Sequence, residues 1–596
     1  MLAAQRLDDD NPCRPRHFKP PPCAPVVPEG PATQLIDACR SRLAVVAFVL
    51  TVLFGVVALR DADVVLLPGG AAEASAIHRM HLVAPPPPSR PDIVDRNGAL
   101  LATTLQSPSL YADPKEILDR AAAAKAIAAS LPGLSVAEIY SRLNPAKSFV
   151  WVKRHLTPAE QYDVNRLGIP GLDFQPEERR FYPFGDLAAH VVGYCGIDNR
   201  GSAGVERGID DKVQDKSRPV QLSLDARVQF VVHDELKRVI SDFSAKGAAG
   251  IVMDVRTGEI IALVSLPDFD PNKPFSQAEF AKSANRLANA DKAIFNKITV
   301  GDYEIGSVFK IFNTAMALDS GVATMTKTYD ASHPIHIGRF TIEDYHGKHR
   351  WLSVPEIFMY SSNIGSARMA VEAGAARQRD YLARFGLLKP APLDLDKVST
   401  PHFPSVWHEV NVMTIAFGHG ISVSPLQAIT GVAAVVNGGI LHRPTLLKQA
   451  PGTAPPGVRV ISAKTSEQMR KLMRLVVEYG TATKAAAPGY VVGGKTGTAE
   501  KALGGHYAEK KLLSTFIGAF PMNDPKYALL MMVDEPHGNK QTYGYATAGW
   551  TVAPATSRII QRIAPILGVP PVDENSPQLV QALTIQSLQG KKIESY

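Results

Sequence analysis

A serine and a lysine stand three residues apart in the stretch Tyr303-Glu304-Ile305-Gly306-Ser307-Val308-Phe309-Lys310. The apolar run 308–318 predicts a helix, with Ser307 near its N-terminus and Lys310 one turn further on the same face. A serine hydroxyl becomes a nucleophile when a base removes its proton, and a lysine does so once burial and nearby charge lower its pKa. The pair therefore predicts nucleophilic catalysis. By itself, a Ser-x-x-Lys spacing is expected roughly twice by chance in a chain of this length.

Two further motifs follow in order along the chain. The first is Ser361-Ser362-Asn363, and the second is Lys495-Thr496-Gly497-Thr498. Taken alone, each motif also fits a structural role, such as a helix cap or a strand end. A Lys-Thr-Gly triplet is expected by chance about once in ten chains of this size, so the ordered trio indicates a single site.

The elements that must bring these motifs together can be predicted from the pattern of apolar residues. Helices are predicted over 225–240 and 553–564, and a long, mostly helical section runs to about residue 480. Runs rich in β-branched residues predict a hairpin and three later strands: 250–255, 259–266, 490–498, 512–520 and 527–533. We expect one five-stranded antiparallel sheet flanked by helices, with the Ser307 helix beside strand 490–498. The predicted fold class is α/β (α+β).

In this order the motifs resemble those of class B penicillin-binding proteins, and most of all the cell-division type. The resemblance covers about residues 88–560. It includes six further stretches: Arg90 to Ala102, Arg180-x-Tyr182-Pro183, Gly201-x-x-Gly204-x-Glu206, Phe417-Gly418-His419-Gly420, Ser424-Pro425-Leu426-Gln427 and Gly493-Gly494 ahead of Lys495. Ile305 stands where the family often has proline, and Pro91 where glycine or alanine is common. Neither departure removes a chemical group.

The resemblance implies a peptidoglycan D,D-transpeptidase that cross-links stem peptides of the septal cell wall through a serine acyl-enzyme. β-Lactams would inhibit it by acylating Ser307. The implied catalytic residues are the nucleophile Ser307, the base Lys310, the proton relay Ser361, the positioning amide Asn363 and the positively charged Lys495. The implied substrate-binding strand contains Thr496, Gly497 and Thr498. Backbone N–H groups of Ser307 and Thr498 would form the oxyanion hole.

The implied partners are the D-Ala-D-Ala donor peptide with its amine acceptor, β-lactams, a membrane glycosyltransferase of the FtsW type and other divisome proteins. The four cysteines, Cys13, Cys23, Cys39 and Cys195, show no metal-ligand spacing, so we expect no metal. We also expect no cofactor. The net charge is +7. Without an RNP or zinc-finger signature, this mild basicity predicts no nucleic-acid partner.

The N-terminal segment indicates how the chain is anchored. Residues 43–59 are almost entirely apolar and predict a single transmembrane helix. Basic residues before this span place the N-terminus in the cytoplasm and the catalytic domain in the periplasm, at the bacterial inner membrane. A cleaved signal peptide is the alternative, but the preceding tail is too long for a usual n-region. The expected divisions are a disordered cytoplasmic tail (1–42), this helix (43–59), a linker (60–88), a pedestal or dimerisation-like domain (89–217), a serine DD-peptidase/β-lactamase-like transpeptidase domain (218–570) and a C-terminal tail (571–596).

Other functions fit part of the same pattern. The site also suits a D,D-carboxypeptidase or a β-lactamase, although we find no counterpart of the class A β-lactamase glutamate between Asn363 and Lys495. An elongation-type transpeptidase is a second alternative. Ser361-Ser362-Asn363 followed by Ile364-Gly365 favours the division type, because elongation-type relatives tend to carry Ser-Cys-Asp. A non-enzymatic β-lactam sensor or division scaffold is a third alternative.

Overall fold

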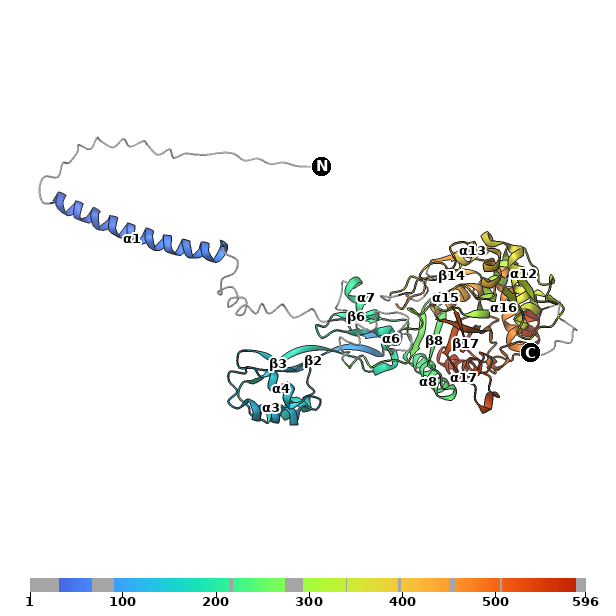
Figure 1. Cartoon of the computed structure of the whole chain (residues 1–596), viewed down its shortest axis with the longest axis horizontal. Coiled ribbons are helices and arrows are strands. Elements are labelled where there is room, and N and C mark those ends of the chain that lie inside the picture. Colours follow the sequence, from blue (N-terminus) through green and yellow to red (C-terminus); the bar gives the residue numbers. More distant parts are fainter. Residues whose placement is uncertain are drawn as a thin grey trace, which may run out of the picture. The chain divides into compact units, whose positions relative to one another are not determined.

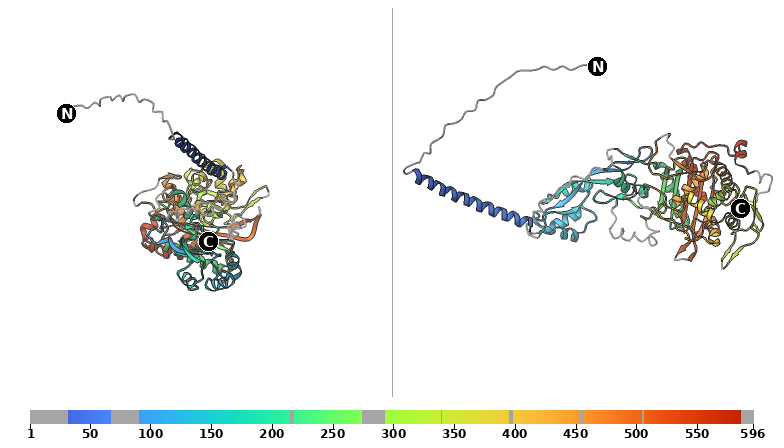
Figure 2. Two further views of the ribbon diagram at one scale, coloured as in Figure 1. Left: turned by 90° about the vertical axis from the view of Figure 1, so that its left-hand side faces the viewer. Right: turned by 90° about the horizontal axis from the view of Figure 1, so that it is seen from above.

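The computed structural model describes residues 32–66, 90–213, 218–273, 293–338, 340–394, 398–450, 452, 456–503 and 506–585. The chain divides into two compact units, residues 1–87 and 88–596. In the first unit the structure describes one helix, α1 (Ala32–Leu66), which is unbroken in every view (Figures 1 and 2).

Helix α1 contains the predicted transmembrane segment. Its window Arg42–Leu59 has a mean hydropathy of 2.5 and no buried side chain, and it is the one span among the described residues long and apolar enough to cross a membrane. The helix is longer than predicted, since residues 32–42 of the expected tail and 60–66 of the expected linker are helical. No proline lies between Pro31 and Pro68 to stop it. Residues 1–31 of the expected tail and the Pro85–Pro88 spacer lie outside the described residues.

The second unit begins with a region that we call the pedestal, from β1 to β7. Among its described residues it holds a five-stranded sheet of order β3-β2-β1-β7, in which β4 pairs with β2. Its elements are β1 (Ile93–Val94), β2 (Leu100–Ala112), α3 (Arg120–Ser130), α4 (Val136–Arg142), β3 (Val150–Lys153), α5 (Pro158–Asn165), β4 (Leu172–Phe181), η1 (Gly185–Ala188), α6 (Ala189–Val192), β5 (Tyr194–Cys195), β6 (Gly201–Ala203), α7 (Gly204–Lys212) and β7 (Val220–Gln221).

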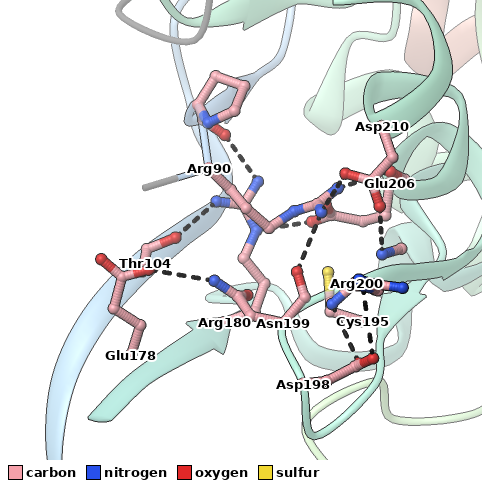
Figure 3. A network of polar contacts seen from close by, with 12 residues as sticks. Arg90, Thr104, Glu178, Arg180, Cys195, Asp198, Asn199, Arg200, Glu206 and Asp210 are labelled. Carbon is pink, nitrogen blue, oxygen red and sulfur yellow. Dashed lines mark hydrogen bonds and ion pairs between the residues drawn. The ribbon is translucent and has the colours of Figure 1, made fainter. Parts of the chain in front are cut away.

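A buried ion cluster holds the pedestal together. Figure 3 shows Arg90 and Arg180 converging on Glu206, whose side chain is fully buried. Arg180 Nε donates to Glu206 Oε1 at 2.6 Å, and Arg90 Nε donates to Oε2 at 2.9 Å. Arg180 Nη2 also donates to the carbonyl of Pro91 at 2.8 Å. Because these residues come from the segment before β1, from β4 and from α7, the cluster joins three distant parts of the chain.

The turn between β1 and β2 connects the pedestal to the rest of the unit. Asp95 Oδ1 accepts the backbone N–H groups of Asn97 and Ala99, each at 2.8 Å, which closes the predicted Asn-Gly turn. Asp95 Oδ2 accepts the N–H of Ala226, the first residue of helix α8, at 3.0 Å. A carboxylate at a helix N-terminus satisfies an otherwise unpaired donor. The turn therefore fixes the start of the larger C-terminal region.

The C-terminal region has the following elements. They are α8 (Ala226–Phe243), β8 (Gly247–Asp254), β9 (Ile260–Leu266), η2 (Gly306–Phe309), α10 (Lys310–Asp319), β10 (Thr328–Asp330), β11 (Ile335–Ile337), β12 (Phe340–Ile342), β13 (Trp351–Ser353), α11 (Val354–Tyr360), α12 (Asn363–Ala373), α13 (Ala375–Arg384), α14 (Glu409–Ile415), α15 (Pro425–Val436), β14 (Ile440–His442), β15 (Gly457–Arg459), α16 (Ala463–Tyr479), η3 (Thr483–Ala485), β16 (Gly493–Leu503), β17 (His506–Phe520), β18 (Tyr527–Asp534), η4 (Lys540–Thr542), α17 (Val552–Ile566) and α18 (Pro577–Leu583).

The predicted sheet is confirmed: its described strands run in the order β16-β17-β18-β8-β9, each antiparallel to its neighbour. Helices α8 and α17 pack on one face and α15 and α16 contact strands from the other side (Figure 1). Every residue of β8 and β18 is buried, as expected for strands covered on both faces. The C-terminal tail was predicted to have little structure, but it contains α18, and residues 586–596 lie outside the described part.

The substitution Glu206→Gln tests the pedestal cluster. It keeps the volume of the side chain but leaves two buried arginines around a neutral amide. We expect a loss of roughly 3 kcal/mol in the free energy of unfolding. Urea unfolding, with hydrogen exchange of residues 90–110 and 201–212 as the local readout, measures this loss.

Glu138→Gln is the matched control, because the Glu138–Arg142 pair is an exposed pair within helix α4. Removing that pair should change the free energy of unfolding by less than about 0.5 kcal/mol. Equal effects of the two variants would contradict a stabilising role of the buried cluster.

Candidate active site

The stretch that carries Ser307 forms the start of a helix, as predicted. Gly306 to Phe309 make one 3₁₀ turn, η2, which continues into α10 at Lys310. Lys310 is fully buried, whereas Ser307 is half-buried. The two side chains meet across one turn, with 2.9 Å between Lys310 Nζ and Ser307 Oγ.

Four oxygen atoms surround the Lys310 amine. Besides Ser307 Oγ, they are the Ser361 carbonyl oxygen at 2.5 Å, Ser361 Oγ at 3.0 Å and Asn363 Oδ1 at 2.7 Å. The carbonyl and amide oxygens only accept hydrogen bonds, so they take two of the amine's hydrogens. A neutral amine then has a lone pair left for the proton of the Ser307 hydroxyl.

Ser361 reaches the amine through an unusual backbone conformation. It is the C-cap of α11 and lies in the left-handed region, with φ of +62°. This conformation costs a serine about 1–2 kcal/mol, and here it turns both the carbonyl and the hydroxyl toward Lys310. The Ser361 hydroxyl also accepts a hydrogen bond from Lys495 Nζ at 2.9 Å. One serine oxygen therefore lies between two lysine amines.

Asn363 is oriented by contacts outside the cluster. Its Nδ2 donates to the carbonyl of Glu343 at 2.9 Å, which directs Oδ1 toward Lys310. Asn363 is the first residue of α12, and the Asp344 carboxylate accepts its N–H, that of Ile364 and the Ser362 hydroxyl. An anion in this position matches the positive end of the helix dipole. The amide is thus held in place by both its side chain and its backbone.

The strand β16 brings the third motif to the cluster. Lys495 is fully buried and its amine points to Ser361. Gly497 lies against the Ser307 turn so closely that a Cβ there would come within 2.3 Å of the Ile305 carbonyl oxygen. Thr496 Oγ1 contacts Thr481 Oγ1, and Thr498 Oγ1 accepts the N–H of Ala548.

The structure therefore brings together the five residues predicted to be catalytic, Ser307, Lys310, Ser361, Asn363 and Lys495, in one hydrogen-bonded cluster. The three residues predicted to bind substrate lie on the adjoining strand, where both threonine hydroxyls already have protein partners.

Burial strongly affects the two amines. It lowers the pKa of Lys310 to about 7, although the nearby Asp344 carboxylate acts in the opposite direction. Burial and the charge of Lys310 likewise lower the pKa of Lys495. Both nitrogens lie within 3.0 Å of the same oxygen, Ser361 Oγ. Two charges at most roughly 6 Å apart would repel by about 3 kcal/mol at an effective dielectric of 20, so the pair favours a neutral amine.

Comparison with known proteins identifies the family. The family described as "Penicillin binding protein transpeptidase domain" matches residues 248–557, and "Penicillin-binding Protein dimerisation domain" matches residues 85–221. The chain belongs to the penicillin-binding protein transpeptidase family.

Individual relatives agree with this assignment. The chain is 41% identical over 498 residues to the probable peptidoglycan D,D-transpeptidase FtsI of Caulobacter vibrioides, a match that covers 81% of this chain and 82% of that protein. It is 32% identical over 520 residues to the probable peptidoglycan D,D-transpeptidase PenA of Neisseria meningitidis, with 81% and 86% covered. Among solved structures, penicillin-binding protein 3 of Mycobacterium tuberculosis complexed with aztreonam aligns with a TM-score of 0.63 and 25% identity, covering 82% of this chain and 98% of that one.

Two residues that support the site in this penicillin-binding protein were not assigned a role from the sequence. Asp344 holds the start of α12, yet it precedes Asn363 by 19 residues and no local pattern connects them. Gly418 lies against the nucleophile turn, where a Cβ would come within 2.1 Å of the Gly306 carbonyl oxygen. Gly418 belongs to one of the stretches that carry the resemblance, and that stretch was the available signal for it.

The pKa of Lys310 predicts how acylation depends on pH. Only the neutral amine accepts a proton from Ser307, so the second-order rate constant for acylation by benzylpenicillin should rise as pH increases through about 7. The expected rise is about tenfold between pH 6 and pH 8, followed by a plateau. Stopped-flow or gel-based labelling measures it, with circular dichroism to verify that the fold is unchanged. A rate constant that is flat over this range would argue against Lys310 as the base.

Proposed function

We propose that Ser307 is the nucleophile of a septal peptidoglycan D,D-transpeptidase and that Lys310 is its general base. As a member of the penicillin-binding protein transpeptidase family, the chain is a peptidoglycan transpeptidase, and β-lactam binding is typical of that family. The observation that carries the residue assignment is the Lys310 amine, which is buried among two obligate acceptors and the Ser307 hydroxyl. This arrangement suits the removal of a proton from Ser307.

In the acylation step, Ser307 Oγ attacks the carbonyl carbon between the two terminal D-alanines of the donor stem peptide. Its proton passes to Lys310 Nζ as the Oγ–C bond forms. The developing oxyanion is proposed to bind the backbone N–H groups of Ser307 and Thr498. One such donor is typically worth about 3 kcal/mol in the transition state. The C–N bond then breaks to leave an acyl-enzyme on Ser307.

The departing D-alanine amine needs a proton, and Ser361 is proposed to supply it. The Ser361 hydroxyl lies 3.0 Å from Lys310 Nζ and 2.9 Å from Lys495 Nζ, so it can regain a proton from a lysine. Lys495 is proposed to attract the terminal carboxylate of the donor, together with the hydroxyls of Thr496 and Thr498 and the backbone at Gly497. Binding of that anion stabilises charge on Lys495 and so favours the neutral form of Lys310.

In the second step, an amine of a neighbouring stem peptide attacks the acyl-enzyme carbonyl. Its proton returns through Lys310, and Ser307 is released with a new amide bond between the two stem peptides. Attack by water on the same intermediate would instead give D,D-carboxypeptidase activity. A transpeptidase that acts in cell elongation rather than in division is the second alternative.

We propose that helix α1 anchors the chain in a membrane, because its window Arg42–Leu59 is long and apolar enough to cross one. We further propose a cytoplasmic N-terminus and a periplasmic catalytic region, because basic residues precede the apolar span. A membrane glycosyltransferase of the FtsW type is the proposed partner that polymerises the glycan. Other divisome proteins are proposed to dock on the pedestal.

Ser307→Ala tests the nucleophile. We expect covalent labelling by a fluorescent penicillin to fall below one-hundredth of the wild-type level, because the substitution removes the oxygen that is proposed to form the acyl bond. The melting temperature should stay within about 2 °C, since Ser307 is half-buried and the change is small. The control is Ser320→Ala at the end of the same helix, which should label normally. Persistent labelling of Ser307→Ala would show that another residue is the nucleophile.

Product analysis separates transfer from hydrolysis. The full-length enzyme is given a D-Ala-D-Ala stem peptide and an acceptor amine, and the products are resolved by mass spectrometry. Cross-linked dimers support transpeptidation, whereas release of D-alanine with only shortened monomers would indicate a carboxypeptidase.

A further inference from the structure

A cleft of about 480 Å³ lies in the C-terminal region, in the size range of small-ligand sites. Strands β10 and β13 and helices α12 and α14 form its walls. The described lining residues do not include Ser307, Lys310, Ser361, Asn363 or Lys495. The polar and aromatic residues among the described lining are Lys327, Thr328, Tyr329, Asp330, Trp351, Arg368, Glu372 and Glu409.

The lining has the chemistry of a carbohydrate site. Trp351 is 60% exposed on β13, a strand whose described partner is β10 alone. An indole face packs well against the C–H face of a sugar ring, while carboxylates, lysine and arginine bond to the hydroxyl edges. Two cations and three anions nearly balance among the described lining residues, which favours a neutral polyhydroxylated ligand over a highly charged polymer.

We propose that this cleft binds the amino-sugar strand of peptidoglycan, the part of the donor that carries the reacting stem peptide. The inference rests on the proposed function, because it assigns a second binding site to the same substrate. It adds recognition of the glycan to recognition of the D-Ala-D-Ala terminus.

Distances along helix α12 suit this substrate. The helix begins at Asn363 in the active site, and Arg368 and Glu372 of the cleft follow on it. A rise of 1.5 Å per residue puts them roughly 8 and 14 Å along the axis. A stem peptide of four residues spans up to about 14 Å when extended. Helix α12 therefore carries residues of both the active site and the cleft, at an axial separation comparable with the extended length of the four stem-peptide residues that precede the reacting bond.

The polar groups of the cleft are held in position. Lys327 pairs with Glu372, and its amine lies 5.4 Å above the ring of Tyr329. At the base, Met413 belongs to one apolar cluster with Ile342 and Phe417. Phe417 adjoins Gly418, which contacts the nucleophile turn. The apolar cluster that contains the cleft residue Met413 is thus adjacent in sequence to the glycine that packs against the nucleophile turn.

The test compares two donors on the full-length chain in nanodiscs: a disaccharide-linked stem pentapeptide and the same pentapeptide without sugar. We expect Trp351→Ala to lower kcat/KM for the glycan-linked donor about tenfold. The free pentapeptide and the rate of penicillin acylation should change less than about twofold. Glu409→Gln, which alters an exposed cleft residue, should lower kcat/KM for the glycan-linked donor alone, by about threefold.

Phe230→Ala is the matched control, because Phe230 is an aromatic residue 53% exposed on helix α8 and outside the cleft. It should leave both donors unaffected. If Trp351→Ala lowers kcat/KM equally for both donors, Trp351 has a structural role. If it lowers kcat/KM for neither donor, the cleft does not bind the glycan and a protein partner becomes its candidate ligand. Each result overturns the proposal.

Direct binding separates this proposal from the proposed function. Saturation-transfer NMR with the disaccharide pentapeptide and the Ser307→Ala chain should detect the sugar protons, and Trp351→Ala in the same background should remove that signal. A wild-type chain that turns over neither donor would refute the transpeptidase assignment, while the sugar signal would still test the cleft. Absence of the sugar signal with normal turnover of the free pentapeptide would refute the cleft alone.

Discussion

The chemistry of this protein depends on two buried lysine amines that share one serine hydroxyl. Lys310 and Lys495 both lie within 3.0 Å of Ser361 Oγ and are removed from solvent. Burial disfavours charge on either amine, and their mutual repulsion disfavours charge on both. A lysine that is ordinarily a cation is thereby able to act as a base near neutral pH. The remaining contacts of the site hold the two amines and the Ser361 hydroxyl at these distances.

Three segments distant in the chain must meet for this to happen, and the fold provides the means. The antiparallel sheet places β16 against the nucleophile turn, and the left-handed Ser361 turns the α11–α12 connection toward Lys310. Asp344 fixes the start of α12 from outside the cluster. Asp95 connects the pedestal to the start of α8, because its carboxylate accepts the N–H of Ala226.

The sequence predicted the sheet and the five clustered residues because both leave local signals. β-Branched runs mark the strands, and the ordered motifs mark the site. Other features depend on tertiary contacts that no short pattern encodes. Asp344 acts across 19 residues, and Thr496 and Thr498 bond to Thr481 and Ala548. Helix α1 extends beyond the predicted apolar span at both ends, because hydropathy marks the apolar residues and not the ends of a helix.

The central claim is that Lys310 is neutral in the resting enzyme above its pKa of about 7. Neutron diffraction from deuterium-exchanged crystals at pH 8.5 shows the hydrogens directly. The account predicts two deuterium atoms on Lys310 Nζ, directed at the Ser361 carbonyl and Asn363 Oδ1, and a Ser307 hydroxyl deuterium pointing to the lone pair. Three deuterium atoms on Lys310 Nζ, one of them aimed at Ser307 Oγ, would contradict it.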